Sequence, residues 1–287
     1  MNASLQQSLT AAWMSPASDP EAGGSVTANL NYLVPPLGRN AVHVVPLGGG
    51  EARRTAEYAT TAVVIRDARL SGLAPTLDRG GFDLQRQNSS VVDFFDDEEI
   101  RAVYYPEMQR LVRKATGARE VVVFDHNVRI DGGAHVPNSR VPVRIVHNDY
   151  TEKSGPQRVR DLIGGERAES LLENRVAIVN AWRSIAGVVR TAPLGLIHAR
   201  SVRTSDLVST DLIYPDRVGE IYEVAGNPAH RWYYFSEMNR DEVLLIKGYD
   251  SRIDVARFTP HSAFNHPDTP KDAPPRTSIE IRSLVFF

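Results

Sequence analysis

The sequence predicts a mainly β protein with a few helices (α+β), built as a sandwich or barrel. Beyond about residue 174 the apolar runs are short and extended, with turn residues between them. Further upstream, two stretches show helical spacing of apolar residues. The chain has 287 residues, 42% of them hydrophobic, which is enough for one large core. We therefore expect a loosely ordered arm over residues 1–27, rich in Ala, Ser, Gly and Pro, and a single domain over 28–287.

The first half of this domain should mix strands and helices. Asp96 begins an acidic segment that suits a helix N-terminus, and Gly117 follows the last apolar residues at helical spacing as a stop signal. The expected elements are strands at 41–45 and 62–65, a loop over 73–88, a helix from Asp96 to Gly117, a strand at 120–124, and a helix from about 156 to 174 that is interrupted at Gly164-Gly165.

The second half should be almost entirely β. Its strand candidates are rich in β-branched and aromatic residues and lie between turn signals. They are residues 177–182, 194–197, 221–224, 231–235, 243–246 and 279–285.

A possible metal site begins where an extended apolar run ends in His147-x-Asp149. Residues i and i+2 of a strand point to the same side, so this imidazole and carboxylate can face one point. His261 and then Arg276-x-Ser278 follow near the C-terminus. Two histidines and one carboxylate form the ligand set of non-haem Fe(II) oxygenases. Arg276 is then the expected anchor for the far carboxylate of 2-oxoglutarate, which it would grip through two parallel hydrogen bonds.

Other interpretations of these histidines have to be weighed. His-x-Asp alone also fits a surface pair at the end of a strand. His266 and His126 are competing ligands. His266 falls in a stretch typical of a turn, and His126 has no carboxylate at matching spacing. We therefore expect a loop position for His266 and a packed or hydrogen-bonded position for His126.

Short motifs around these residues run in order along the chain. They are Gly81-Phe82, Tyr105-Pro106-Glu107, Val123-Phe124-Asp125-His126, Arg129, Val146-His147-Asn148-Asp149-Tyr150, Asn180-Ala181-Trp182-Arg183, Pro193-Leu194, Arg231-Trp232-Tyr233-Tyr234, Tyr249-Asp250-Ser251, Pro260-His261-Ser262-Ala263-Phe264 and Arg276-Thr277-Ser278-Ile279-Glu280-Ile281-Arg282. From about residue 28 to its end, the sequence resembles the CmcJ/AsaB-type hydroxylase/desaturases, also called gibberellin desaturase-like. These are non-haem Fe(II)/2-oxoglutarate-dependent oxygenases.

The resemblance implies a double-stranded β-helix, a cupin-like jelly-roll core with flanking helices. It also implies Fe(II), 2-oxoglutarate and O2, and a reaction that hydroxylates, desaturates or cyclises a small metabolite, as in secondary metabolism. Departures at Ala181, Ser184 and Gly195-Leu196-Ile197 leave the metal residues intact and the substrate open.

The resemblance also assigns roles to individual residues. His147, Asp149 and His261 would be the catalytic metal ligands. Arg276 and Ser278, which share a strand face, would bind 2-oxoglutarate, with Asn180 as a further contact to the co-substrate or substrate. Candidates for contact with a polar or carboxylate-bearing substrate are Tyr150, Trp182, Arg183, Arg129 and Arg158.

Within this set, some alternatives remain open. Asn180 and Trp182 share a strand face, and Arg183 lies on the other face unless a bulge intervenes. Trp182 fits a core position equally well. Arg282 has the same parity as Arg276 but is expected to be solvated or paired.

Two rival functions are an Fe(II) oxygenase without 2-oxoglutarate, in which Arg276 binds a substrate carboxylate, and a non-catalytic jelly-roll binding protein. The net charge of −2 shows none of the excess positive charge that is typical of nucleic-acid-binding proteins. No run approaches the roughly 18 apolar residues of a membrane span, and we see no signal peptide. The absence of cysteine excludes thiolate sites and fits a reducing cytoplasm. Nothing in the sequence argues against a homodimer.

Overall fold

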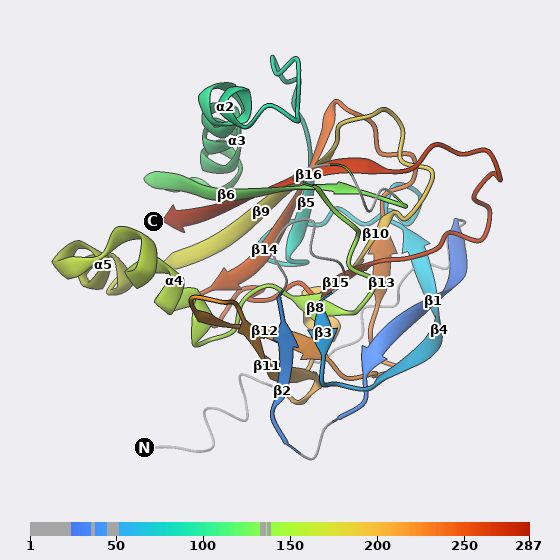
Figure 1. Ribbon diagram of the computed structural model, residues 1–287, viewed down its shortest axis with the longest axis horizontal. Coiled ribbons are helices and arrows are strands. Elements are labelled where there is room, and N and C mark those ends of the chain that lie inside the picture. The colour runs from blue at the N-terminus through green and yellow to red at the C-terminus, as the bar shows by residue number, and fades with distance from the viewer. Residues whose placement is uncertain (1–23, 36–37, 45–51, 133–135, 137–138) are drawn as a thin grey trace.

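Two curled sheets form the body of the protein (Figure 1). The computed structural model describes residues 24–35, 38–44, 52–132, 136 and 139–287. The ten-stranded sheet has the order β1 (Ser25–Leu33), β4 (Tyr58–Asp67), β13 (Trp232–Tyr234), β10 (Leu194–Ile197), β15 (His261–Ala263), β8 (His147–Asn148), β12 (Val218–Val224), β11 (Leu207–Ile213), β2 (Asn40–His43) and β3 (Arg53–Arg54).

The second sheet has six strands, in the order β5 (Phe82–Arg86), β14 (Glu242–Asp250), β9 (Val176–Ser184), β16 (Thr277–Phe286), β6 (Glu120–Ile130) and β7 (Ser139–Arg140). The last strand of the chain, β16, lies in the middle of this sheet and pairs antiparallel with both β9 and β6. The mainly β, cupin-like jelly roll with flanking helices that the sequence predicted is confirmed.

The two faces of the six-stranded sheet differ in chemistry. On β16, Ile279 and Ile281 belong to a large apolar cluster that also contains residues of the helix α3 (Tyr105–Thr116). Glu280 and Arg282 alternate with them and line cavities that also contain His147 of the other sheet. The helix-covered face is therefore the larger apolar core, and the face toward the ten-stranded sheet carries polar groups into the interior.

The predicted helix at Asp96 has the expected ends. The Asp96 side chain accepts hydrogen bonds from the backbone N–H of Glu98 and Glu99, and Gly117 ends α3 with a φ of 71°. Met108 of α3 is fully buried against the six-stranded sheet. The helical elements are α2 (Asp97–Glu99), a π-helical segment (Ile100–Tyr104), α3, α4 (Ser154–Ile163), α5 (Gly165–Leu172) and the 3-10 turns Ala199–Ser201 and Thr204–Asp206. Among the described helices, none is both long and apolar enough to cross a membrane.

Several boundaries differ from the prediction. The loop expected over 73–88 is wrong, because β5 lies within it and pairs with β14. The prediction contains no strand at β1, β3, β7, β11 or β15. Of the arm expected over 1–27, residues 1–23 lie outside the described residues and 25–27 belong to β1. The run before Asp149 contains only the short strand β8, with a single bridge between Ile145 and Asn31 upstream of it.

Candidate metal centre

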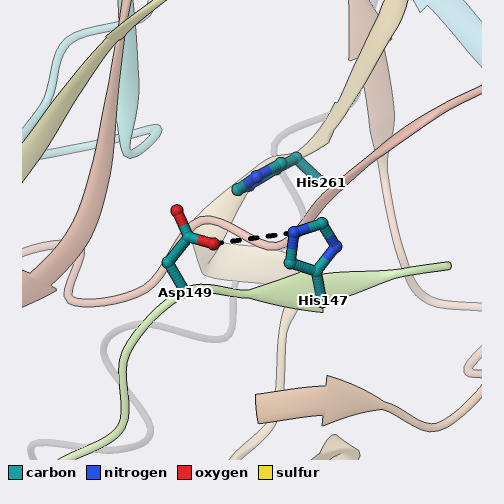
Figure 2. A group of neighbouring side chains, drawn as sticks. All are labelled: His147, Asp149 and His261. Atoms are coloured by element: carbon teal, nitrogen blue, oxygen red, sulfur yellow. Dashed lines mark ion pairs between the residues drawn. The ribbon is translucent and has the colours of Figure 1, made fainter. Parts of the chain in front are cut away.

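Three side chains converge where β8 and β15 lie side by side. His147 and His261 are register partners in this antiparallel pair, and Asp149 follows β8 directly. One ligand atom from each of the three residues lies within 4.8 Å of the others, and Figure 2 shows the side chains directed toward a common point. The two imidazole rings are 4.6 Å apart between centroids, and His147 Nε2 lies 3.6 Å from Asp149 Oδ1.

Backbone carbonyls orient both histidines. His147 Nδ1 lies 2.8 Å from the carbonyl oxygen of Ile145, and His261 Nδ1 lies 3.0 Å from that of Thr259. Because a carbonyl can only accept, each Nδ1 must carry the proton, which leaves Nε2 as the electron-pair donor. Burial, followed by the nearby His261, lowers the pKa of His147 to about 3, so its ring is neutral near pH 7. His147 is therefore in the form that binds a metal, and His261 directs the same ring nitrogen, Nε2, away from its backbone partner.

Asp149 is held from two sides. Asn180 Nδ2, on β9, donates to Asp149 Oδ2 at 2.6 Å, and Arg282 Nε, on β16, lies 3.5 Å from the same oxygen. Burial by itself would raise the pKa of Asp149, but the charge of Arg282, followed by His261 and His147, holds it well below its usual range. The carboxylate is thus ionised and fixed in place. The amide nitrogen of Asn180 is used on Asp149, while its Oδ1 has no partner in the described part of the chain, so its expected contact to the co-substrate or substrate stays a prediction.

Arg276 is a buried arginine whose hydrogen-bond donors are only partly used. Its side chain is 4% exposed and stacks over the Trp182 ring, with the guanidinium carbon 5.5 Å from the ring centroid. Its Nη1 donates to the carbonyl of Ala192, but its Nε and the hydroxyl of Ser278 are buried without a partner in the described part of the chain. Burial, and then the charge of Arg129, lower the pKa of Arg276 to about 9, which still leaves it charged near pH 7. A buried cation with unused donors fits a carboxylate ligand.

A narrow cavity connects these two groups, since Arg276 and Trp182 line it together with His147, Asp149 and His261. Two imidazole nitrogens and a carboxylate oxygen suit Fe(II), and all three of these residues line this cavity. The chemistry of the residues therefore fits an iron ion, and Arg276 would fit a carboxylate of an acidic co-substrate.

Two larger cavities reach the same carboxylate. Arg129, on β6, lines one of about 600 Å³, which also contacts His147 and Asp149. Tyr150 and Arg158 line the other, of about 830 Å³. Asp149 and Arg282 lie on the walls of both. The structure thus brings these three predicted substrate residues to space beside the triad.

Arg183 is a correction. The prediction that it lies on the opposite face of β9 from Asn180 and Trp182 is right, but that face is covered by the helix layer. The Arg183 side chain is fully buried, lies over the Tyr104 ring with its guanidinium carbon 5.3 Å from the ring centroid, and donates to the carbonyl of Gln87. It lines none of the three cavities, so the expected substrate contact is wrong.

The competing histidines are bonded elsewhere. His126 Nδ1 lies 2.9 Å from the Tyr105 hydroxyl, and its Nε2 lies 3.2 Å from Asp97. His266 Nε2 lies 3.2 Å from the Tyr234 hydroxyl. In the described residues the only cluster with metal-ligand geometry is the predicted one.

Sequence reasoning missed the position of Arg282. Arg282 was expected to be either solvated or paired, and it is paired with Asp125 at 2.9 Å and with Glu280 at 2.9 Å. Its closeness to Asp149 was not predicted. The signal was present in the alternation of β16, because Glu280 and Arg282 continue the parity of Arg276 and Ser278 toward the interior.

Comparisons with known proteins agree with this geometry. Residues 30–286 match a family described as Oxidoreductase/YMDC permease-like domain. The hydroxylase/desaturase efuI of Hormonema carpetanum is 36% identical over 256 residues, which cover 80% of this chain and 85% of the relative. The Fe(II)/2-oxoglutarate-dependent dioxygenase nvfI of Aspergillus novofumigatus is 33% identical over 193 residues, with 67% and 69% covered.

A solved structure of an iron-dependent enzyme has a similar fold. The iron and alpha-ketoglutarate-dependent endoperoxidase NvfI superposes with a TM-score of 0.81 at 27% identity. The alignment covers 92% of this chain and 98% of that one.

Proposed function

The chain belongs to the hydroxylase/desaturase family of Fe(II)/2-oxoglutarate-dependent dioxygenases, and we propose that it uses Fe(II), 2-oxoglutarate and O2 to oxidise an unactivated C–H bond of a small secondary metabolite. The outcome is hydroxylation, desaturation or cyclisation. The observation that carries the proposal is the His147-Asp149-His261 triad placed on one cavity with a buried arginine, Arg276, that has unused donors.

Each group of residues has a distinct task. His147, Asp149 and His261 would hold Fe(II), with both imidazoles presenting Nε2 because their Nδ1 atoms donate to backbone carbonyls. When bound, Fe(II) would supply the activation of O2 needed to oxidise a C–H bond, which no side chain provides. The protein contributes orientation, charge neutralisation and a site from which water is excluded.

Arg276 would neutralise the far carboxylate of 2-oxoglutarate. Its planar guanidinium can form two parallel hydrogen bonds to a carboxylate, and the Ser278 hydroxyl, on the neighbouring position of the same strand face, can donate a third. Trp182 covers the guanidinium and keeps water from competing for it. Asn180 acts through Asp149, as a positioning residue for the metal carboxylate.

The rival in which Arg276 binds a substrate carboxylate makes a different prediction for the co-substrate. We would add 2-oxoglutarate to the Fe(II) protein without O2 and follow the metal-to-ligand charge-transfer absorbance. Under O2 and ascorbate, succinate release would then be measured for the wild type and for His147→Ala. Iron binding without an absorbance band and without succinate would favour the rival oxygenase. Failure to bind iron at all would favour the non-catalytic binding protein.

Three further expectations are part of the proposal. Residues 28–287 act as one catalytic domain, because β8 and β15 of one sheet supply the metal ligands while β16 of the other supplies Arg282 and Ser278. A cytoplasmic location fits the cysteine-free sequence. A homodimer is the oligomeric state to test first, by light scattering of the purified protein.

A further inference from the structure

The cavity of about 600 Å³ beside the triad carries excess positive charge. Its wall mixes apolar side chains with six arginines and three aspartates, one of which is the metal carboxylate Asp149. Three of the arginines have carboxylate partners at 2.7–2.9 Å: Arg54 with Glu223, Arg101 with Asp97, and Arg282 with Asp125. The other three are Arg129, Arg140 and Arg217, and none of them has a carboxylate within ion-pair distance among the described residues.

Arg129 and Arg140 form the unusual pair among these three. They are register partners in the parallel pairing of β6 with β7, and both line the cavity. Like charges placed opposite each other on neighbouring strands are destabilising. Arg217, in contrast, is exposed and its guanidinium carbon lies 3.9 Å from the Tyr214 ring centroid. A compensating anion between Arg129 and Arg140 would remove the repulsion.

The donors of Arg129 are largely unused. The hydrogen bond that its side chain makes within the described residues runs from Nη1 to the carbonyl of Val141, at 2.8 Å. Burial lowers the pKa of Arg129, because desolvation disfavours the charged guanidinium, and the nearby charge of Glu280 opposes this only in part. The apolar part of the same wall includes Val143, Leu212 and Ile221, which suits a hydrocarbon body. The cavity therefore combines arginines that lack a carboxylate partner, an apolar lining, and His147 and Asp149 on its wall.

We propose that the substrate is a carboxylic acid whose carboxylate is held by Arg129 and Arg140 while its hydrocarbon body lies against the apolar wall beside His147 and Asp149. This inference rests on the proposed function, because it assigns the cavity to the substrate of that reaction. It is separate from the binding of 2-oxoglutarate at Arg276. Arg129 lines the narrow cavity of Arg276 as well, but Arg140 lines only the larger one. A substitution of Arg140 therefore distinguishes the binding of the substrate acid from the binding of 2-oxoglutarate.

The test uses 2-naphthoic acid and its neutral analogue 2-naphthamide as probes. Their binding would be measured by equilibrium dialysis against the full chain loaded with Fe(II) and saturating 2-oxoglutarate without O2. We expect the wild type to bind the acid at least about tenfold more tightly than the amide, which corresponds to about 1.4 kcal/mol. Arg140→Gln should remove most of this preference and leave amide binding unchanged, while Arg140→Lys should retain part of it.

Arg101→Gln is the matched control, because Arg101 lines the same cavity but is already paired with Asp97 at 2.7 Å. Acid binding no tighter than amide binding in the wild type, including no measurable binding of either probe, would overturn the inference. So would an Arg140→Gln variant that behaves like Arg101→Gln. The charge-transfer band is recorded in the same samples. If the band is absent, the result counts against the proposed co-substrate chemistry. In that case the ratio of acid to amide affinity, measured on the iron-free protein, still decides the role of Arg140.

Discussion

Replacing Arg276 with methionine should stabilise the ligand-free protein and at the same time weaken the binding of 2-oxoglutarate. Arg276 is 4% exposed and its Nε has no partner in the described structure. An unsatisfied buried donor costs about 1–3 kcal/mol, and apolar replacement of buried charged groups is often neutral or stabilising. Without ligand, the variant should therefore have an equal or higher melting temperature than the wild type.

When 2-oxoglutarate is present, replacing Arg276 should be unfavourable, because it weakens the binding of that ligand. Truncating one partner of a buried charge pair costs roughly 2–5 kcal/mol, which is about thirtyfold to several-thousandfold in affinity. Arg276→Lys keeps the charge but loses the two parallel hydrogen bonds, so its loss should be intermediate. Fe(II) affinity should be nearly unchanged in both variants, because Arg276 touches none of the three metal ligands in the described hydrogen-bond and ion-pair network.

The assay is an anaerobic titration of the Fe(II) protein with 2-oxoglutarate, followed by charge-transfer absorbance, together with thermal unfolding with and without the ligand. Arg183→Met is the matched control. Arg183 is equally buried and also has donor nitrogens without a partner in the described structure, but it lies under the helix layer against Tyr104, so Arg183→Met should leave the titration unchanged. Superimposable titrations for the wild type and Arg276→Met would refute the reasoning and indicate that Arg276 binds the substrate instead.

Three other predictions concern the metal site and the core. His261→Ala should abolish stoichiometric Fe(II) binding in metal analysis, whereas His266→Ala should leave it intact; the reverse result would show that the ligand is misassigned. Asn180→Ala removes the 2.6 Å hydrogen bond to Asp149 and should weaken Fe(II) binding by about 10- to 100-fold in competition with a chelator, and unchanged affinity would contradict its positioning role. Burial lowers the pKa of His230, so the unfolded chain gains a proton that the folded protein resists, and the free energy of unfolding should fall as the pH drops below about 6.5. Urea unfolding at several pH values should show a flatter dependence for His230→Gln, and an equal slope would exclude this linkage.

Local signals explain what the sequence predicted well. The helix at Asp96 was predicted because its capping residue and its terminal glycine act within one turn of the chain. The metal triad was predicted because two ligands are two residues apart and the resemblance located the third. In both cases the informative residues are close in sequence or belong to a motif.

Long-range pairing explains most of what was missed. The sequence predicts a loop where β5 lies because Gly80-Gly81 breaks the local pattern, yet the pairing of β5 with β14 gives it a place in the sheet. For Asn180, the hydrogen bond to Asp149 joins residues from different sheets, and no local pattern encodes it. Parity placed Arg183 on the correct side of β9, but only the packed structure shows that a helix covers that side.

The central position of β16 has a consequence for biosynthesis. Because β16 fills the space between β9 and β6, both of those strands keep an unpaired edge until residues 277–286 have been synthesised (Figure 1). His261, Arg276 and Arg282 also come from this last part of the sequence. A chain that ends before His261 would thus leave two strand edges open to pairing with other chains and would lack one of the three metal ligands. We expect such chains to depend on chaperones and to be removed by proteases rather than to persist as partly active enzyme.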